Sequence, residues 1–162
     1  MRLRLTTLLL TLLMSMGAWA EKNEMISLKD FMEDRADNVS NPDALYVSYR
    51  CLSYYYNLSG ILSLGGEREK ELNEKLEQTK VDFIEFGWLF WRLIEAEAER
   101  EADYDTYTEN LTNSITKMTR SYQIETNNSW NNTGSYFNDY INTEGNTCQL
   151  VHQAFTQMMP DK

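Results

Sequence analysis

The chain has 162 residues, with 25 acidic and 15 basic side chains and a formal net charge of −10. This length is typical of a single domain. So large an excess of negative charge repels nucleic acid and anionic lipid, which are therefore not expected partners. The charge would attract a basic protein, but keeping the chain soluble is a sufficient explanation and the one we favour.

The first twenty residues have the composition of a bacterial secretory signal peptide. Arg2 and Arg4 precede an apolar run from Leu5 to Met16, and Ala18-Trp19-Ala20 matches the small-x-small cleavage signal. We predict a signal peptide over residues 1–20 and a periplasmic or secreted mature chain that begins at Glu21. The apolar run is shorter than the ~20 residues that span a bilayer, which disfavours the alternative of an uncleaved anchor. No transmembrane segment is expected after cleavage.

A polar N-terminal segment, residues 21–41, comes next, with a short helix expected near residues 27–36. The bundle domain is predicted over residues 42–162. Its first long helix should have Asn41 as N-cap and Pro42 in its first turn. The helix should end at Gly65-Gly66. Its apolar seam follows spacings of four and three: Val47, Cys51, Tyr54, Leu58 and Ile61.

The second helix is expected from about Glu67 to about Ala102. It contains the most apolar stretch of the mature chain, Phe83 to Ile94, which reads FIEFGWLFWRLI. At about 1.5 Å per residue this stretch is roughly 18 Å long, too short to cross a membrane. It is apolar on nearly all sides, which indicates a central helix with neighbours on two sides. Gly87 would let one neighbour approach closely.

Five residues of this stretch form a candidate interaction or pocket site: Glu85, Trp88, Phe90, Trp91 and Arg92. Aromatic side chains that stay exposed mark protein interfaces, and the alternative is that they pack inside the bundle. If the stretch is buried, its two charged side chains need partners, in a structural ion pair or in a functional site.

The end of the second helix, EAEAEREADYD, offers a candidate acidic surface: Glu95, Glu97, Glu99, Glu101, Asp103 and Asp105. Acidic side chains at a helix C-terminus oppose the helix dipole. This end is therefore expected to fray, or to meet a cation or a basic partner. The ligand spacing of a calcium-binding EF-hand loop is absent, so we predict no metal site.

The third helix is expected over Asp105–Asn127. It should be followed by a loop at Ser129–Ser135, a short helix at Tyr136–Ile141 and a break at Asn142–Asn146. A last helix then carries Cys148. No stretch has the alternating pattern of a strand. The pattern predicts an all-α fold, a bundle of about four principal helices.

The chain has two cysteines, Cys51 and Cys148. Each lies on a core-facing stripe, one on the first long helix and one on the last. An exported protein meets an oxidising environment, so we predict a disulfide that staples the two ends of the bundle, with free thiols as the alternative.

The chemistry of an enzyme is missing from the sequence. His152 is the only histidine, both cysteines are assigned to the disulfide, and no GxSxG motif is present. A lone histidine beside apolar residues is usually structural. We predict no catalytic residue and no cofactor.

The leading hypothesis is an exported, non-enzymatic helical protein that binds a basic or apolar protein partner, in an adaptor, inhibitor or immunity-type role. Two alternatives stay open. One is a carrier of a small ligand or cofactor, with an aromatic pocket inside the bundle. The other is a structural homo-oligomer that buries its tryptophans against a second copy.

Overall fold

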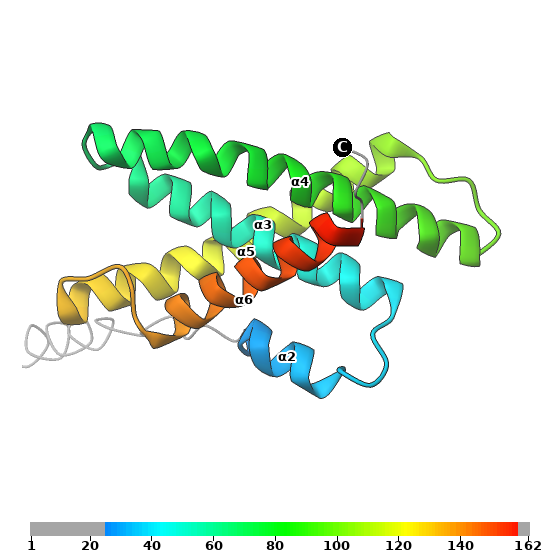
Figure 1. Ribbon diagram of the computed structural model, residues 1–162, viewed down its shortest axis with the longest axis horizontal. Coiled ribbons are helices and arrows are strands. Elements are labelled where there is room, and N and C mark those ends of the chain that lie inside the picture. Colours follow the sequence, from blue (N-terminus) through cyan, green and yellow to red (C-terminus); the bar gives the residue numbers. More distant parts are fainter. Residues whose placement is uncertain (1–24, 159–162) are drawn as a thin grey trace, which may run out of the picture.

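The computed structural model describes residues 25–158, and over that range it has five helices and no strand (Figure 1). They are α2 (Leu28–Asp34), α3 (Asn41–Leu62), α4 (Glu67–Glu97), α5 (Tyr104–Thr133) and α6 (Asp139–Met158). The all-α prediction is confirmed. The expected count of about four principal helices is wrong, because five helices are present over that range. The short helix expected near residues 27–36 is α2, which packs against α6. The predicted signal peptide lies outside the described residues.

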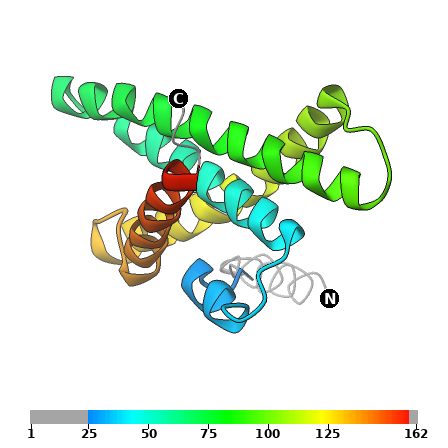
Figure 2. The same cartoon turned by 45° about the vertical axis from the view of Figure 1, so that its right-hand side comes forward.

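Helices α3 and α4 form a long antiparallel hairpin (Figures 1 and 2). Helices α5 and α6 pack against α3 and also contact α4, and α2 lies against α6 at the bottom of Figure 1. None of the helices described combines the length and the apolar character that crossing a membrane requires.

The central helix of the bundle is α3. Every residue from Val47 to Tyr55 is buried, and α3 packs against α4, α5 and α6. We expected the central helix to contain the apolar stretch Phe83–Ile94, and that expectation is wrong. In that stretch the buried residues lie on one side of α4: Phe83, Phe86, Gly87 and Phe90.

The buried side of α3 contains polar residues, so the sequence of this helix does not look like that of a fully buried one. The hydroxyl of Ser48 donates to the carbonyl oxygen of Ala44 at 2.9 Å, and that of Ser53 donates to the carbonyl oxygen of Tyr49 at 2.7 Å. Because each hydroxyl is satisfied within its own helix, a serine can be buried there at little cost.

Helix α3 begins one residue earlier than expected. Its N-cap is Ser40, whose side chain accepts from the backbone N–H of Asp43, and the Asp43 carboxylate accepts from the backbone N–H of Ser40. This reciprocal capping box satisfies two backbone donors that the helix leaves unpaired. Pro42 lies in the first turn, as predicted. At the other end, α3 stops at Leu62 and α4 begins at Glu67.

Helix α4 ends at Glu97, five residues short of the predicted end at Ala102. Glu99 has a left-handed backbone with φ of 54°. The Arg100 guanidinium reaches back to the Glu95 carboxylate with two hydrogen bonds, of 2.6 and 2.9 Å, and closes the turn.

Helices α5 and α6 are both longer than predicted. Helix α5 runs through the expected loop as far as Thr133 and stops at Gly134, which has a φ of 73°. Helix α6 runs without a break through Asn142–Asn146. Gly145 does not end it, because this glycine is where the Tyr54 ring of α3 packs against α6. A side chain there would overlap the Tyr54 hydroxyl.

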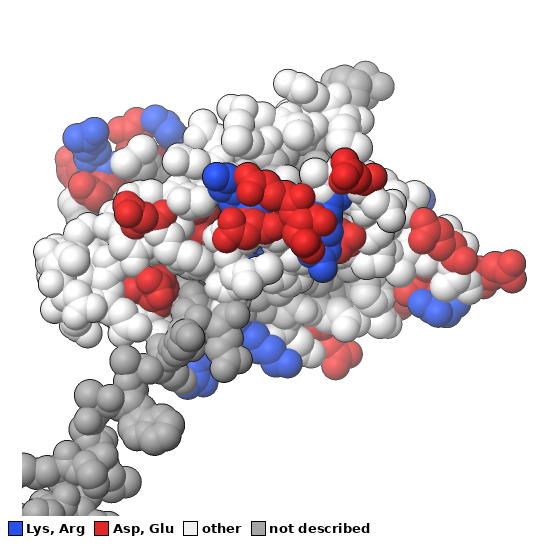
Figure 3. Space-filling model, turned by 90° about the horizontal axis from the view of Figure 1, so that it is seen from below, with Lys and Arg blue, Asp and Glu red and all other residues white. Residues whose placement is uncertain are grey.

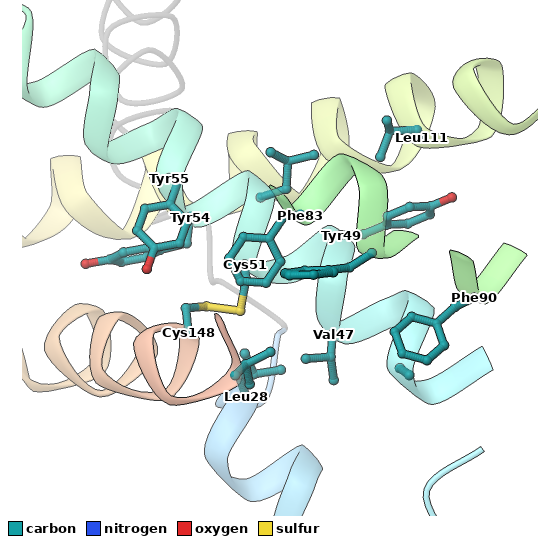
Figure 4. Close-up of a cluster of buried hydrophobic side chains, with 14 of the residues drawn as sticks. Leu28, Val47, Tyr49, Cys51, Tyr54, Tyr55, Phe83, Phe90, Leu111 and Cys148 are labelled. Carbon is teal, nitrogen blue, oxygen red and sulfur yellow. A yellow bond between two sulfur atoms is a disulfide. The ribbon is translucent and has the colours of Figure 1, made fainter. Parts of the chain in front are cut away.

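The predicted disulfide between Cys51 and Cys148 is confirmed. It joins α3 to α6 across the buried core (Figure 4), with the two Cα atoms 5.2 Å apart. Leu28 of α2 and Phe83 of α4 belong to the same core, and both are fully buried. The staple therefore lies where α2, α3, α4 and α6 all contribute side chains.

Candidate functional site

An apolar groove of about 300 Å³ lies between α2, the start of α3 and the end of α6. We call it the α2–α6 groove. Its walls are Phe31, Met32, Arg35, Val39, Asp43, Ala44, Val47, Leu150, Val151, Ala154 and Phe155. The two charged residues on this wall, Arg35 and Asp43, pair with each other at 2.9 Å. The Arg35 guanidinium also lies over the Phe31 ring, 4.1 Å from its centroid.

The rim of the groove is unusually exposed for apolar side chains. Leu150 is 66% exposed, Val39 is 60% exposed and Met32 is 36% exposed. Single exposed apolar side chains are common, but several around one hollow indicate a surface that binds something.

A buried cluster of charges holds the first residues of α2 against the bundle. It consists of Arg50 from α3, Tyr122 from α5 and Glu144 from α6, and we call it the N-terminal clip. Arg50 donates to the Glu144 carboxylate at 2.6 Å and to the Tyr122 hydroxyl at 3.0 Å. Tyr122 donates to the same carboxylate. All three side chains are fully buried.

The clip forms hydrogen bonds with the backbone at the start of α2. The other carboxylate oxygen of Glu144 accepts from the backbone N–H of Leu28 at 2.5 Å. Arg50 donates from two nitrogens to the carbonyl oxygen of Ile26, each at 3.2 Å. Leu28 is the one residue of α2 that is buried, and the groove lies between the more exposed part of α2 and the helices α3 and α6.

The electrostatics of the clip favour a charged guanidinium. Burial alone would lower the pKa of Arg50, but the nearby Tyr122 and Glu144 outweigh it and raise the pKa. Burial raises the pKa of Tyr122 well above its ordinary value of 10.0, so this phenol stays protonated and donates. A buried ion pair is tolerated when further hydrogen bonds satisfy both partners, as they do here.

The sequence-predicted aromatic residues pack against other rings. Trp88 and Trp91 are half-buried: the ring centroid of Trp88 lies 5.1 Å from that of Tyr104 and 5.4 Å from that of Tyr107, and the ring centroid of Trp91 lies 6.1 Å from that of Tyr107. Phe90 is buried and contacts Phe155, with ring centroids 5.3 Å apart. Of the three predicted aromatics, Phe90 is thus linked to the α2–α6 groove, through Phe155.

Gly87 allows this packing, as its place in the sequence suggested. A Cβ at Gly87 would lie 2.5 Å from the Tyr107 hydroxyl, which donates to the carbonyl oxygen of Ile84 at 2.6 Å. Glu85 and Arg92 are both exposed. A buried charged network in this stretch of α4 was the wrong interpretation; the buried ion pair is in the N-terminal clip.

The predicted acidic residues divide into those with an internal role and those on the surface. Glu95 is largely buried and is held by Arg100, whose hydrogen bonds lower the pKa of that carboxyl. Asp103 caps α5 by accepting from the backbone N–H of Thr106. The remaining members are exposed: Glu97, Glu99, Glu101 and Asp105.

One exposed acid of this group lies beside the α2–α6 groove. The side-chain amide of Asn41 donates to Glu97 at 2.6 Å, and Asn41 is the first residue of α3. This contact brings the end of α4 next to the segment that carries Val39 and Asp43. The candidate acidic surface and the groove are therefore neighbours, which the sequence did not indicate.

His152 forms a pair with Asp82, with 2.8 Å between the imidazole Nε2 and the carboxylate. Its ring centroid lies 5.6 Å from that of Phe83 and 6.2 Å from that of Phe86. This arrangement joins α6 to α4 and matches the structural role expected for a lone histidine. Within residues 25–158, no group of three or more His, Cys, Asp or Glu side chains is placed to hold a metal ion.

Sequence reasoning missed Arg50, Glu144 and the exposed Leu150. A signal for the clip was present, because Glu144 precedes the core residue Cys148 by one helical turn, and Arg50 follows the core residue Val47 at a spacing of three. Charged residues on a core-facing stripe need partners. No such signal existed for the groove, because its walls come from three separate helices.

Comparisons with protein-family models, with curated proteins and with solved structures found no match for this chain.

Proposed function

We propose that this chain is an exported, non-enzymatic protein that acts by binding another protein through the α2–α6 groove. The single observation that carries this proposal is the groove itself, an apolar hollow with exposed Val39 and Leu150 on its rim. Covering those side chains with apolar residues of a partner would remove their surface from water, which is the main driving force for association.

A protein partner fits this groove better than a small ligand. Pockets for small molecules typically have a few polar groups that converge on the ligand and fix its orientation. Here the charged wall residues, Arg35 and Asp43, are already paired with each other. At about 300 Å³, the groove has the size of the smallest ligand pockets, which leaves room for a few apolar side chains.

An oxidising compartment is part of the proposal. The Cys51–Cys148 disulfide is typical of proteins outside the reducing cytosol. The N-terminal sequence independently suggests cleavage after Ala20. The mass of the protein recovered from the periplasm tests this part: a chain that begins at Glu21 supports export, and one that keeps Met1 argues against it.

Capture experiments with matched variants test the binding role. Tagged protein is expressed with its own leader in its source organism, and the captured proteins are compared among wild type, Leu150→Asp and Leu72→Asp. Leu150 lies on the groove and is 66% exposed; the control Leu72 lies on α4, away from the groove, and is 42% exposed. We expect a discrete protein that wild type and the control capture and that Leu150→Asp loses at least ~10-fold, about 1.4 kcal/mol. Equal capture by all three chains would refute the groove as the binding surface.

The two alternative functions predict other results from the same material. A carrier would retain a non-protein mass in a native mass spectrum. A homo-oligomer would form a dimer whose dissociation depends on concentration, and Trp88 and Trp91 would lose exposure in it. Either result would replace the proposal of a binding protein.

A further inference from the structure

We propose that the partner enters the α2–α6 groove with a cationic, amphipathic segment, whose apolar side fills the groove while its lysines or arginines meet the acidic surface around it. This inference rests on the proposed function and adds the chemistry of the partner.

The charge around the groove is strongly one-sided. From Leu28 to Val47, the stretch that forms α2 and the start of α3, five residues are acidic and two are basic. Figure 3 looks at the face on which α2 lies and shows acidic side chains gathered there. Helix α2 itself has three exposed acids, Asp30, Glu33 and Asp34. The opposite wall adds no cation, since α6 contains no lysine or arginine.

Both basic residues of this stretch already have acidic partners. Lys29 lies 3.6 Å from Glu33, and Arg35 lies 3.1 Å from Asp34 and 2.9 Å from Asp43.

Two acidic residues of the same stretch form no ion pair within the described part of the chain, so they are free to interact with a partner protein. Asp30 and Asp37 are exposed, and the described part of the chain places no cation within ion-pair distance of either one. Neither one lines the groove, but both belong to the segment that forms its α2 wall, so this segment carries unbalanced negative charge near the groove.

A second group of exposed acids lies near the segment that carries the rim residue Val39. Asn41 donates to Glu97 at 2.6 Å, and Glu99 and Glu101 follow Glu97 in the sequence. An anionic partner segment would be repelled by both groups of acids. A cationic segment would be attracted from a distance of about a Debye length, roughly 8 Å at physiological salt.

The shape of the groove suits a helix better than a long extended strand. The wall residues of α6 follow helical spacing, with Leu150, Val151, Ala154 and Phe155 on one face. No sheet edge exists among the described residues to which an extended segment could add main-chain hydrogen bonds. Helix-in-groove binding uses apolar anchors at i, i+3 or i+4, and i+7, and two such anchors match a hollow of this size.

A set of three designed peptides tests this inference on the oxidised mature protein. The first is an amphipathic helix with leucines on one face and lysines on the other. In the second, glutamates replace the lysines. The third keeps the composition of the first but distributes the leucines around the helix. Fluorescence anisotropy gives the dissociation constant of each peptide at about 50 and about 200 mM salt, because attraction between exposed charges weakens as screening increases.

We expect the first peptide to bind at least ~10-fold more tightly than either of the others, and to lose affinity at the higher salt concentration. Leu150→Asp should abolish binding. Asp30→Asn with Asp37→Asn should weaken it several-fold and reduce its salt dependence. The control pair Glu71→Gln and Glu74→Gln, on an exposed part of α4, should leave it unchanged.

Equal binding of the lysine and glutamate peptides would overturn the inference, as would binding that the two aspartate substitutions do not affect. These failures differ from a failure of the proposed function. If the groove variant still loses a captured protein while the lysine peptide has no advantage, the groove binds a protein of another chemistry. If the groove variant captures everything that wild type does, the proposed function itself fails.

Discussion

Arg50 and Glu144 are 94 residues apart in the sequence and form an ion pair of 2.6 Å in which both side chains are fully buried. Further hydrogen bonds join the pair to the hydroxyls of Tyr122, Tyr46 and Tyr140. Others join it to the backbone of Ile26 and Leu28. The pair therefore does more than join α3 to α6. It fixes the start of α2, and α2 forms one wall of the α2–α6 groove.

Glu144→Gln should be strongly destabilising. The substitution keeps an acceptor for Leu28 but leaves the buried Arg50 without a negative partner, which typically costs about 3–5 kcal/mol. The matched control is Glu71→Gln, which breaks the exposed pair with Lys75 and should change the free energy of unfolding by less than about 0.5 kcal/mol. Urea unfolding of the oxidised proteins measures both. If the two substitutions lower the free energy of unfolding equally, the buried ion pair of the clip contributes no more to stability than an exposed pair.

The same substitution should loosen α2 before it unfolds the bundle. Backbone amides of Leu28–Asp34 should exchange hydrogen faster in Glu144→Gln than in wild type, because the clip is the buried attachment of α2. Amides in the middle of α3 provide the internal reference. Unchanged exchange in α2 would show that its packing against α6 holds it without the clip.

Replacing both cysteines with serine should lower stability substantially. The disulfide closes a sequence separation of 97 residues, for which the chain-entropy model gives up to roughly 4.7 kcal/mol, with less expected if the unfolded chain keeps residual structure. Denaturant unfolding of Cys51→Ser with Cys148→Ser should agree with that of the wild-type protein under reducing conditions. A loss below about 1 kcal/mol would show that the bundle does not depend on its staple.

Two glycines should resist substitution by alanine and a third should accept it. A Cβ at Gly87 would crowd the Tyr107 hydroxyl, and one at Gly145 would crowd the Tyr54 hydroxyl, in both cases against a buried ring. We expect each substitution to cost about 1–3 kcal/mol. Gly60→Ala is the control, because nothing lies within 4 Å of its Cβ position. Gly60 lies in the last turn of α3 and has no positive φ, so alanine should stabilise the protein there by about 0.4–1 kcal/mol. Thermal unfolding of the three variants will show whether this order holds.

Stability should decline in alkaline solution. Burial raises the pKa of Tyr54 to about 12, and burial also raises the pKa of Tyr49, Tyr107 and Tyr122 from the ordinary 10.0. Above pH 10 the unfolded chain loses phenol protons that the folded chain keeps. The free energy of unfolding is therefore unaffected by these groups below pH 10 and falls above it, by up to about 1.4 kcal/mol per pH unit for each tyrosine.

Urea unfolding between pH 8 and pH 11 measures this decline. Tyr54→Phe should reduce the slope, whereas Tyr56→Phe, at an exposed position, should leave it unchanged. A free energy of unfolding that stays constant up to pH 11 would contradict the burial of these phenols.

The sequence predicted the fold class and the disulfide because both depend on local patterns. Apolar residues at spacings of three and four indicate helices wherever they occur, and Cys51 and Cys148 each lie on such a stripe. The helix boundaries were less reliable. A glycine such as Gly145 often ends a helix, but here it lets the Tyr54 ring pack closely against α6. The sequence alone does not show which of these two roles a glycine has.

The site could not be predicted for two physical reasons. A groove is made by the space between helices, so the exposure of Leu150 depends on where α2 is held. The second reason is that the most hydrophobic stretch of the sequence need not belong to the central helix of the bundle. Trp88 and Trp91 remain partly exposed on α4, whereas the polar Ser48 and Ser53 are fully buried on α3.

Site-directed photo-cross-linking from Leu150 tests the central claim most directly, because it reports what touches the groove in intact cells. A photoreactive residue is placed at Leu150 in one chain and at Leu72 in the control chain, and both are irradiated in intact cells. We expect Leu150 to form a covalent adduct of one discrete mass, absent from the control, that digestion assigns to a lysine- or arginine-rich amphipathic segment of another protein. No adduct from Leu150, or the same adducts from both positions, would contradict the claim that this protein acts by binding a partner in the α2–α6 groove.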